Sequence, residues 1–341
     1  MITDNQSEIT PGAFGNYGII ISKENYMPLI SASDYPVRPA IKILLQDKTT
    51  KKNIIFATNA YKDRGPDFGE ANEITVEKLA YMDLLPRVEK ELAHQQARTK
   101  AKAEVFTPSW VCNKMNNHCD EEWFGRPGVF NVETENGWEM NTDRIEFGEL
   151  SWKDYVDSRR IEITCGEAPY IVSRYDTTTG DIIPVPDRIG ILDRKLRVVN
   201  ENASDDKEWL KWSERAFQSV YGYEYQGDNL LIARINLLNT YADYYRAKLE
   251  CDPDNATVRK IANIIAWNFW QMDGITGTIP FGKPEEEYTN FTIFDYGIEV
   301  PNADEASEMV EHGQSDTETP VCRIFDWRSN ESVKFTDLKK G

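Results

Sequence analysis

Apolar positions change their spacing along the chain, and this change predicts which parts are strands and which are helices. Short apolar runs at 17–22, 40–46 and 53–58 predict strands, the last two joined as a hairpin. From Thr75 the apolar residues recur at helical spacing, and a polar helix-like stretch continues to residue 102, with a kink or break at Pro86. We therefore expect residues 1–103 to form a small α+β segment that ends in a long helix.

Beyond residue 160 the chain alternates short apolar runs with long amphipathic stretches. Strands are predicted at 160–165 and 221–225, with a further apolar run after 267. Helices are predicted at 205–222, at 227–252 and from 255 into 268–274, the last of them capped by Asn255 or Thr257. The order β, α, β, α, β is typical of a parallel, doubly wound sheet. The acidic stretch 284–319 holds one more strand signal at 291–300, and 321–338 predicts two antiparallel edge strands. The irregular stretch 119–160 is expected to be a loop-like insertion.

Composition supports an aromatic-rich globular protein and limits its partners. Lys and Arg number 39 against 57 Asp and Glu, so the net charge is 39 − 57 = −18. This field repels phosphate, so any DNA contact must come from a local basic stripe or from a partner subunit. No apolar run approaches the roughly 20 residues that span a bilayer, and the N-terminus lacks a signal-peptide pattern. The sequence thus predicts a cytoplasmic protein with no membrane partner.

The cysteines and histidines do not form a recognisable metal or disulfide pattern. Five cysteines are scattered without a Cys-x-x-Cys pair. Cys112, His118 and Cys119 lie close together, but a fourth ligand at the usual spacing is missing, so no metal site is expected.

A basic run at 188–202 has two interpretations. It contains Arg188, Arg194, Lys195 and Arg197, which could contact DNA phosphates. Alternatively, it is a solvated turn whose charges pair with the abundant acids. The sequence does not decide between the two.

Acidic residues follow the successive predicted strands, and this is the pattern that indicates chemistry. Ligands of open α/β sheets lie beyond the carboxyl ends of the strands. At the first corner, Gly166 allows close backbone approach, Glu162 can accept from an ammonium group, and Tyr170 can pack the floor. Glu224 can accept from both vicinal hydroxyls of a ribose, and Asp273 from an exocyclic amine of adenine. Taken singly, either acid is more simply a cap of the following helix. Together they predict a cofactor that contains a nucleoside.

Four segments carry a family resemblance: "EVFTPSWVC", "EITCGEAPY", "YGYEYQGDNLLIARINLL" and "NFWQMDG". In this order they resemble the cofactor half of the N6-adenine DNA methyltransferases, specifically the modification subunits of restriction systems, described as restriction endonuclease subunit M. The resemblance covers residues 104–281. It implies a Rossmann-like methyltransferase domain over 104–341 that binds S-adenosylmethionine.

The resemblance also implies roles for individual residues. The family's Thr-Pro corner, at the methionine end of the cofactor, matches Phe106, Thr107 and Pro108. The Asp-Pro-x-Cys-Gly-x-Gly loop is matched by Glu162, Cys165 and Gly166. Glu224 stands for the acid on the ribose, and Asp273 for the acid on the adenine amine. Within the local sequence, Pro108 is predicted at the first helical position, with Thr107 as its cap.

The chain departs from the family pattern at three places. Ala168 replaces the second glycine of the loop, and 162 − 107 = 55 residues separate Thr107 from Glu162, more than the family's usual gap. The catalytic tetrapeptide Asn/Asp-Pro-Pro-Tyr/Phe has no counterpart, since the sequence has neither Pro-Pro nor Asn-Pro. Only "TIPF" at 278–281 could be a degenerate version, with Phe281 as a stacking ring for a flipped base.

The expected function is that of a DNA adenine-N6 methyltransferase-like subunit of a restriction-modification or phage-defence system. A first alternative is a catalytically silent module of the same fold that acts through a partner nuclease or specificity subunit, which the missing tetrapeptide favours. A second alternative is an acidic DNA mimic or anti-restriction protein, which the net charge permits.

Overall fold

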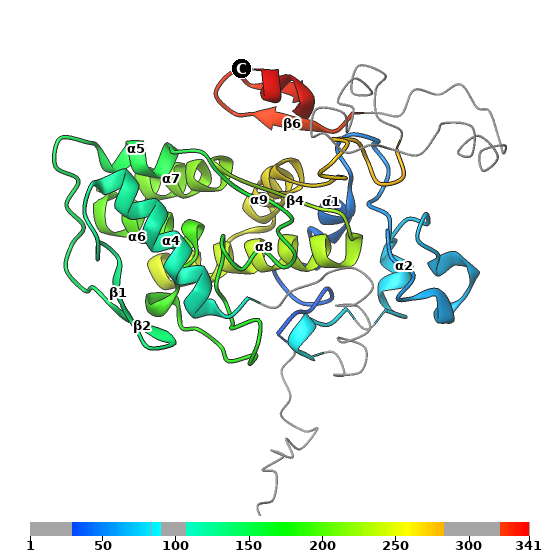
Figure 1. The fold of residues 1–341 in the computed structure, drawn as a ribbon, viewed down its shortest axis with the longest axis horizontal. Helices are drawn as coiled ribbons and strands as arrows, with labels where there is room; N and C mark the ends of the chain where they lie inside the picture. Colours follow the sequence, from blue (N-terminus) through cyan, green and yellow to red (C-terminus); the bar gives the residue numbers. More distant parts are fainter. Residues whose placement is uncertain (1–28, 83, 90–106, 283–320, 341) are drawn as a thin grey trace, which may run out of the picture.

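The computed structural model describes residues 29–82, 84–89, 107–282 and 321–340 (Figure 1). Its α-helices are α1 (Ile41–Leu45), α2 (Val76–Leu79), α4 (Ser109–Phe124), α5 (Trp152–Asp157), α6 (Ile191–Asn202), α7 (Asp206–Gln218), α8 (Gly227–Leu249) and α9 (Asn255–Asn268). Short 3-10 helices are η2 (Lys62–Arg64), η3 (Pro66–Phe68), η4 (Arg87–Glu89), η5 (Val185–Asp187) and η9 (Phe335–Lys340). The strands are β1 (Asn131–Thr134), β2 (Gly137–Met140), β3 (Arg160–Glu162), β4 (Val220–Glu224), β5 (Phe269–Gln271), β6 (Arg323–Asp326) and β7 (Glu331–Lys334).

Three parallel strands form the central sheet, in the order β3-β4-β5. Helices α6 and α7 connect β3 to β4, and α8 and α9 connect β4 to β5, which confirms the predicted β, α, β, α, β order for this part. The strand order follows the chain order, so the described residues contain no reversal of the kind that marks the ligand crevice of a complete doubly wound sheet. The structure therefore establishes a mixed α/β fold with a parallel sheet and small antiparallel sheets.

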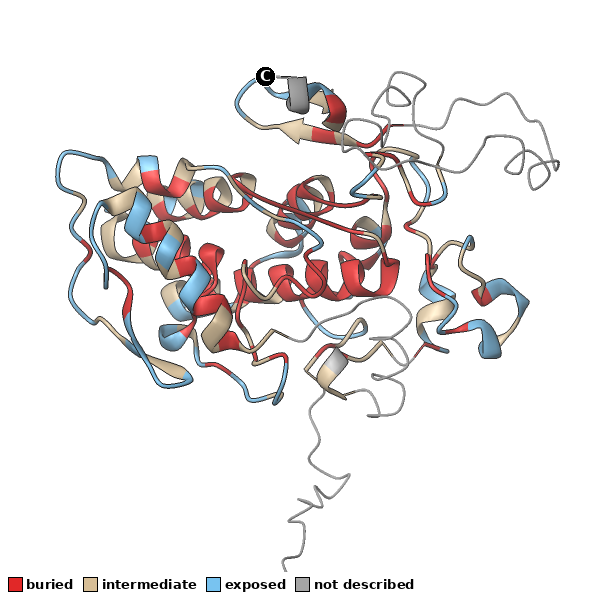
Figure 2. Ribbon diagram, viewed as in Figure 1, coloured by how far each residue is buried: buried red, intermediate tan, exposed pale blue. Residues whose placement is uncertain are grey.

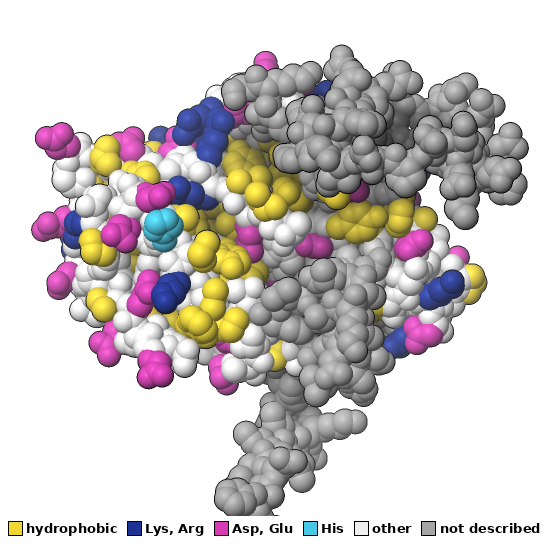
Figure 3. Space-filling view, in the orientation of Figure 1, with side chains coloured by type: hydrophobic (Ala, Val, Ile, Leu, Met, Phe, Trp, Pro, Cys, Tyr) yellow, Lys and Arg dark blue, Asp and Glu magenta, His cyan; other side chains and the backbone are white. Residues whose placement is uncertain are grey.

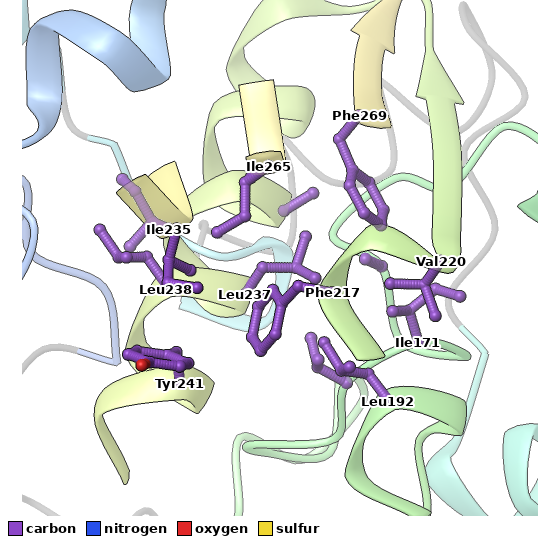
Figure 4. Packing of buried hydrophobic residues seen from close by; sticks show 14 of the residues in the cluster. Ile171, Leu192, Phe217, Val220, Ile235, Leu237, Leu238, Tyr241, Ile265 and Phe269 are labelled. Atoms are coloured by element: carbon purple, nitrogen blue, oxygen red, sulfur yellow. The ribbon is translucent and has the colours of Figure 1, made fainter. Parts of the chain in front are cut away.

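The helix α8 forms the middle of the core. Sixteen of its 23 residues are buried, and in Figure 2 most of the helix is red. Its apolar side chains meet those of neighbouring elements, as Figure 4 shows for Leu237 near Phe217 of α7 and Ile265 of α9. Burying this much apolar surface is the main stabilising term of the fold.

The opposite face of the sheet is covered by the C-terminal hairpin of β6 and β7. Tyr221, Tyr223 and Trp270 project from β4 and β5 and form a second cluster with Cys322 and Ile324. The two antiparallel strands predicted at the C-terminus are present, but they form a two-stranded sheet of their own, so the prediction that they are an edge of the parallel sheet is wrong. A hairpin, and not a second layer of long helices, covers this face.

The predicted hairpin of 40–46 and 53–58 is wrong. Residues 41–45 form α1, and only an isolated bridge between Gln46 and Asn53 remains of the pairing. The physical reason is the spacing of Ile41, Leu44 and Leu45, which lie on one side of a helix and are buried where α1 packs against α8 and α9.

The helix predicted from Thr75 begins as expected but is short. Thr75 is the N-cap of α2, its side chain accepting from the Lys78 amide, and α2 ends at Leu79. The polar continuation at 90–102 lies outside the described residues, as do the strands predicted at 17–22 and 291–300.

The stretch 119–160, expected to be irregular, contains ordered elements. It holds the end of α4, the antiparallel hairpin of β1 and β2, and α5. A two-residue turn at Glu135 and Asn136, with φ of 61° at Asn136, joins the two strands. Asparagine adopts this left-handed conformation more readily than most residues, which favours it in such turns.

Two helix caps differ from the predictions by one or more residues. Pro108, and not Thr107, is the N-cap of α4, and the Ser109 amide donates to Asp176 Oδ2 at 2.7 Å. Asp254, and not Asn255 or Thr257, caps α9, because its side chain accepts from the Thr257 amide.

Among the described helices, no stretch is both long enough and apolar enough to cross a bilayer.

Candidate cofactor site

The carboxyl ends of β3 and β4 bring Glu162 and Glu224 to the same face of the sheet. Glu162 pairs with Gly222, and Glu224 lies two residues further along β4, so the two side chains project to the same side. A Cβ on Gly222 would approach the Phe269 ring to 2.7 Å and the Cys165 Cβ to 3.3 Å. Glycine at 222 thus lets the loop after β3 pack directly on β4.

That loop, 163–168, has three left-handed residues in alternation. Thr164, Gly166 and Ala168 have φ values of 50°, 55° and 64°. Thr164 and Ala168 are not glycine, and such a conformation costs an L-residue roughly 1–2 kcal/mol. Ala168, which stands where the resembled family has its second glycine, adopts a backbone conformation that glycine would adopt without strain.

Glu224 holds this loop from β4. Its Oε2 accepts from the Gly166 amide at 2.9 Å, and its Oε1 accepts from the Gln226 amide at 3.1 Å. The residue is buried. Successive left-handed residues turn backbone amides inward, and this arrangement binds anions; here the anion is a carboxylate of the chain itself.

Glu162 is the most unusual group of the site. Its carboxylate receives hydrogen bonds from the amides of Tyr170 and Ile171. Its Oε2 is buried and has no hydrogen-bond partner among the described residues. Burial raises the pKa of Glu162 well above its usual range. The hydrogen bonds from the two amides lower this pKa, and the nearby Glu224 carboxylate raises it. A positively charged hydrogen-bond donor would supply the partner that Oε2 lacks.

The Thr-Pro corner lies next to Glu162 through Tyr170. A side-chain hydrogen bond joins Tyr170 and Thr107, and the Glu162 charge acts on the Tyr170 hydroxyl, whose pKa burial raises. The Thr107 carbonyl accepts from Thr177 Oγ1 at 2.8 Å. Thr107, Tyr170 and Glu162 are therefore brought together, with Pro108 adjoining Thr107; Phe106 lies outside the described residues.

Cys165 serves packing in this site. It is buried, and its amide donates to the Tyr223 carbonyl at 2.8 Å. Burial, followed by the charges of Glu162 and Glu224, raises the pKa of the Cys165 thiol well above its usual range. The thiol is therefore protonated at neutral pH and is a poor nucleophile.

Asp273 shares no hydrogen-bond partner with Glu162 or Glu224 among the described residues. In the described part of the chain its carboxylate accepts from the Ile275 and Thr276 amides of its own loop. The Phe281 ring is 53% exposed and lies edge-on to the Tyr225 ring, with centroids 6.1 Å apart. The structure thus places Asp273 in a local turn and Phe281 near the end of β4.

The N-terminal segment, to which the sequence assigned no role, closes part of this edge. The Gln271 side chain bonds both to the Ile55 amide, at 2.9 Å, and to the Ile55 carbonyl, at 2.8 Å. The Gly227 amide donates to the Phe56 carbonyl, and a Cβ on Gly227 would lie 2.0 Å from the Ile55 oxygen. Residues 55 and 56 therefore form a wall beyond the carboxyl ends of β4 and β5.

Asn229, in the first turn of α8, was also missed. It is fully buried, and neither atom of its amide group has a hydrogen-bond partner in the described structure. On the same face of α8, Asn236 donates to the Glu167 carbonyl at 3.2 Å. Nothing in the sequence pattern distinguishes Asn229, because its lack of a partner depends on the tertiary packing.

The basic run 188–202 is neither a phosphate-binding surface nor a solvated turn. Most of it is α6, and Arg188, Arg194 and Lys195 are buried. Arg194 pairs with Asp120 and donates to the Asn113 and Asn117 amide oxygens at 2.8 Å each. Lys195 donates to the Val156 carbonyl and to Ser219 Oγ. The predicted pairing with acids is confirmed for Arg188, Arg194 and Arg197, which pair with Asp243, Asp120 and Glu201. The solvated turn is wrong, because most of the run is a helix whose cations bind acceptors inside the molecule.

S-adenosylmethionine carries charges of the sign that this acidic cluster would attract. Its ammonium and sulfonium are cations, and Glu162 offers a buried carboxylate oxygen without a partner next to a second carboxylate. The residues around Glu162 fit the charged end of that molecule. In comparisons of the chain with family models, curated proteins and solved structures, none matches it.

Proposed function

We propose that this chain is an S-adenosylmethionine-binding, methyltransferase-like subunit of a restriction-modification or phage-defence system, with DNA as its macromolecular partner. The observation that carries the proposal is the buried Glu162 oxygen without a partner, beside Glu224 and under a strained loop. Strained backbone and uncompensated buried charge lower stability, and they persist in proteins chiefly where a ligand uses them.

The roles of the residues follow from their positions. Glu162 would accept from the ammonium group of the cofactor, with Thr107 and Tyr170 at the same end. Glu224 would anchor the loop and accept from the ribose hydroxyls. When bound, the cofactor supplies an electrophilic methyl group for transfer to N6 of a flipped adenine.

A second candidate is a catalytically silent module of the same kind, acting through a partner nuclease or specificity subunit. It is favoured by the absence of an Asn/Asp-Pro-Pro-Tyr/Phe sequence anywhere in the chain. Without a group that positions the adenine amine, a site loses most of its rate, because transfer depends on aligning the reacting atoms. Phe281 offers a ring but no amide acceptor.

Isothermal titration with S-adenosylmethionine tests the shared part of both candidates. We expect heat for the wild-type chain and binding weaker by at least about 10-fold for Glu224→Ala, since charged hydrogen bonds contribute ~1.5–3 kcal/mol. Glu331→Ala, an exposed carboxylate on β7, is the matched control and should bind as the wild type does. Absence of heat from the folded wild-type chain would contradict the proposal and leave the acidic DNA mimic.

Transfer of tritiated methyl groups to DNA then separates the two candidates. Label on DNA that depends on the chain and is lost in Glu224→Ala identifies an active enzyme. Cofactor binding with no transferred label identifies the silent module.

A further inference from the structure

The turn 47–52, which follows α1, carries three lysines and is held by its own hydrogen bonds. The Asp47 carboxylate accepts from the Thr49 and Thr50 amides at 3.1 and 3.0 Å, and the Asp47 carbonyl accepts from the Lys51 amide. Lys51 has a φ of 65°, a left-handed conformation that costs an L-residue roughly 1–2 kcal/mol. Strained backbone of this kind occurs chiefly where the geometry is used.

Two lysines of this turn lie against α9. Lys48 Nζ donates to Asn263 Oδ1 at 2.8 Å, and Lys51 Nζ lies 5.2 Å from the centre of the Trp267 ring. Arg259 is exposed one turn of α9 before Asn263. Arg259, Asn263 and Trp267 are spaced four residues apart, so they follow one side of the helix over about 12 Å. None of the three is buried.

Two further cations extend this row of positive charge. Lys52 is exposed next to Lys51. Arg323, the first residue of β6, is joined to the turn because its amide donates to Thr49 Oγ1 at 3.0 Å. The cations of the row are together called the α9 stripe: Lys48, Lys51, Lys52, Arg259 and Arg323.

The α9 stripe has an excess of positive charge. Among the described residues, none of its five cations forms an ion pair with a carboxylate. Asp47 is buried, and its carboxylate is bound by amides of the turn. Burial lowers the pKa of Lys48 to about 8, and the positive charges of Arg234 and Lys51 contribute. On the face shown in Figure 3, by comparison, acidic and basic side chains lie interspersed.

We propose that the α9 stripe binds the phosphate backbone of a nucleic acid, which is DNA if the function proposed above holds; only this choice of nucleic acid rests on that function. Lys51, Lys52 and Arg259 are exposed and would contact the phosphates. One small anion could not contact cations spread over the length of this row, whereas a nucleic-acid strand carries a negative charge about every 3.4 Å. Phosphate contacts position a nucleic acid without reading its sequence.

Fluorescence anisotropy with a short labelled DNA duplex and with its single strand, at low salt and without cofactor, tests the α9 stripe. Lys51→Glu combined with Arg259→Glu should weaken binding at least about 10-fold. It should also reduce the slope of log affinity against log salt by about 1.8, that is about 0.9 for each lost phosphate contact. Lys207→Glu combined with Lys211→Glu, at exposed positions of α7, makes the same change in net charge. This control should weaken binding by less than about 3-fold.

The same two double variants, checked by circular dichroism to be folded, are then titrated with S-adenosylmethionine. Both should bind it as the wild type does, so failure of the α9 stripe and failure of the proposed function are distinguishable. Binding of DNA through the stripe by a chain that binds no cofactor would support the α9 stripe alone. The inference is overturned if the wild type binds neither form of DNA at low salt, or if the two double variants weaken binding equally.

Discussion

The middle of α8 and the carboxyl end of β3 each hold a charged residue, and the two residues differ in how many of their polar atoms have hydrogen-bond partners. Arg234 of α8 is fully buried and donates to carbonyls of three other segments, including Phe269 at 2.8 Å and Gln46 at 3.1 Å. Glu162 of β3 is half-buried, and its buried Oε2 has no partner in the described structure, beside a second carboxylate. The comparison separates a scaffold, in which charges join elements, from the proposed site, in which a buried carboxylate oxygen has no partner in the described chain.

The backbone shows the same contrast. The helix α8 runs through 23 residues without interruption, and its Arg234 ties it to α1, α9 and β5. The loop 163–168 holds three left-handed residues, two of them not glycine. Substitutions should therefore lower stability in the first region and raise or spare it in the second.

The largest effect is expected for Arg234→Leu. It removes the shared donor of carbonyls in α1, α9 and β5 and leaves them buried without it, so the free energy of unfolding should fall by about 3–5 kcal/mol. Urea unfolding measures the change. Arg246→Leu, at a 42% exposed ion pair on the same helix, is the control and should change it by less than about 1 kcal/mol. Equal effects of the two substitutions would contradict the scaffold role.

Glu162→Gln should have the opposite sign. It removes a buried charge without a full set of partners, so we expect higher stability near pH 7–8, on the order of 1 kcal/mol. The folded pKa of Glu162 is raised, so the wild type is most favoured below the carboxyl pKa of unfolded chains, about 4.3, and loses this contribution as the pH rises through the folded pKa. Thermal unfolding from pH 4 to 8 should show the gain of the variant growing with pH. A variant less stable than wild type at pH 8 would contradict the assignment.

Alanine-to-glycine substitutions compare the two backbones directly. Ala168→Gly relieves a left-handed alanine, which offsets the lost methyl group, so stability should stay within about 1 kcal/mol of wild type or rise. Ala233→Gly, in α8, should lower it by about 1–2 kcal/mol through helix propensity and lost packing. Urea unfolding of both proteins checks the sign. The same loss in both would show that the loop is not strained.

Asn229→Leu is expected to have the smallest effect on stability. The buried amide has no hydrogen bond to lose, so an apolar side chain of similar size should be neutral or slightly stabilising, within about 1 kcal/mol. Asn236→Leu is the matched control on the same helix face; it removes donors to the Glu167 carbonyl and the Tyr175 hydroxyl and should destabilise. Thermal unfolding ranks the two, and the reverse ranking would show that Asn229 has a structural partner.

The strands β4 and β5 and the helices α7, α8 and α9 could be predicted from the sequence because short apolar runs alternate there with long stretches at helical spacing. The run 40–46 was predicted to be a strand and forms a helix, because a short apolar run fits a strand as well as a helix. Its packing against α8 and α9 determines that it is helical. The burial of the basic run 188–202 could not be predicted for a related reason. The acceptors of its cations, such as Asp120 and Asn113, belong to α4, which is far away in the sequence.

The sequence could predict which residues of the candidate site lie at strand ends. It could not predict their hydrogen-bond partners. Glu162 and Glu224 meet because parallel strands bring their carboxyl ends to one edge. The contact of Ile55 with Gln271 joins residues 216 positions apart, and no local pattern encodes it. Asp273 follows a strand in the same way as Glu224, but its own loop takes its carboxylate.

The most direct test of the central claim is a titration of wild type and Glu162→Gln with S-adenosylmethionine, whose ammonium group Glu162 is proposed to bind. We predict that the wild type binds it, and that Glu162→Gln, though at least as stable as wild type, binds it about 10-fold or more weakly. Equal binding of S-adenosylmethionine by the two proteins, or none by the folded wild type, would contradict it.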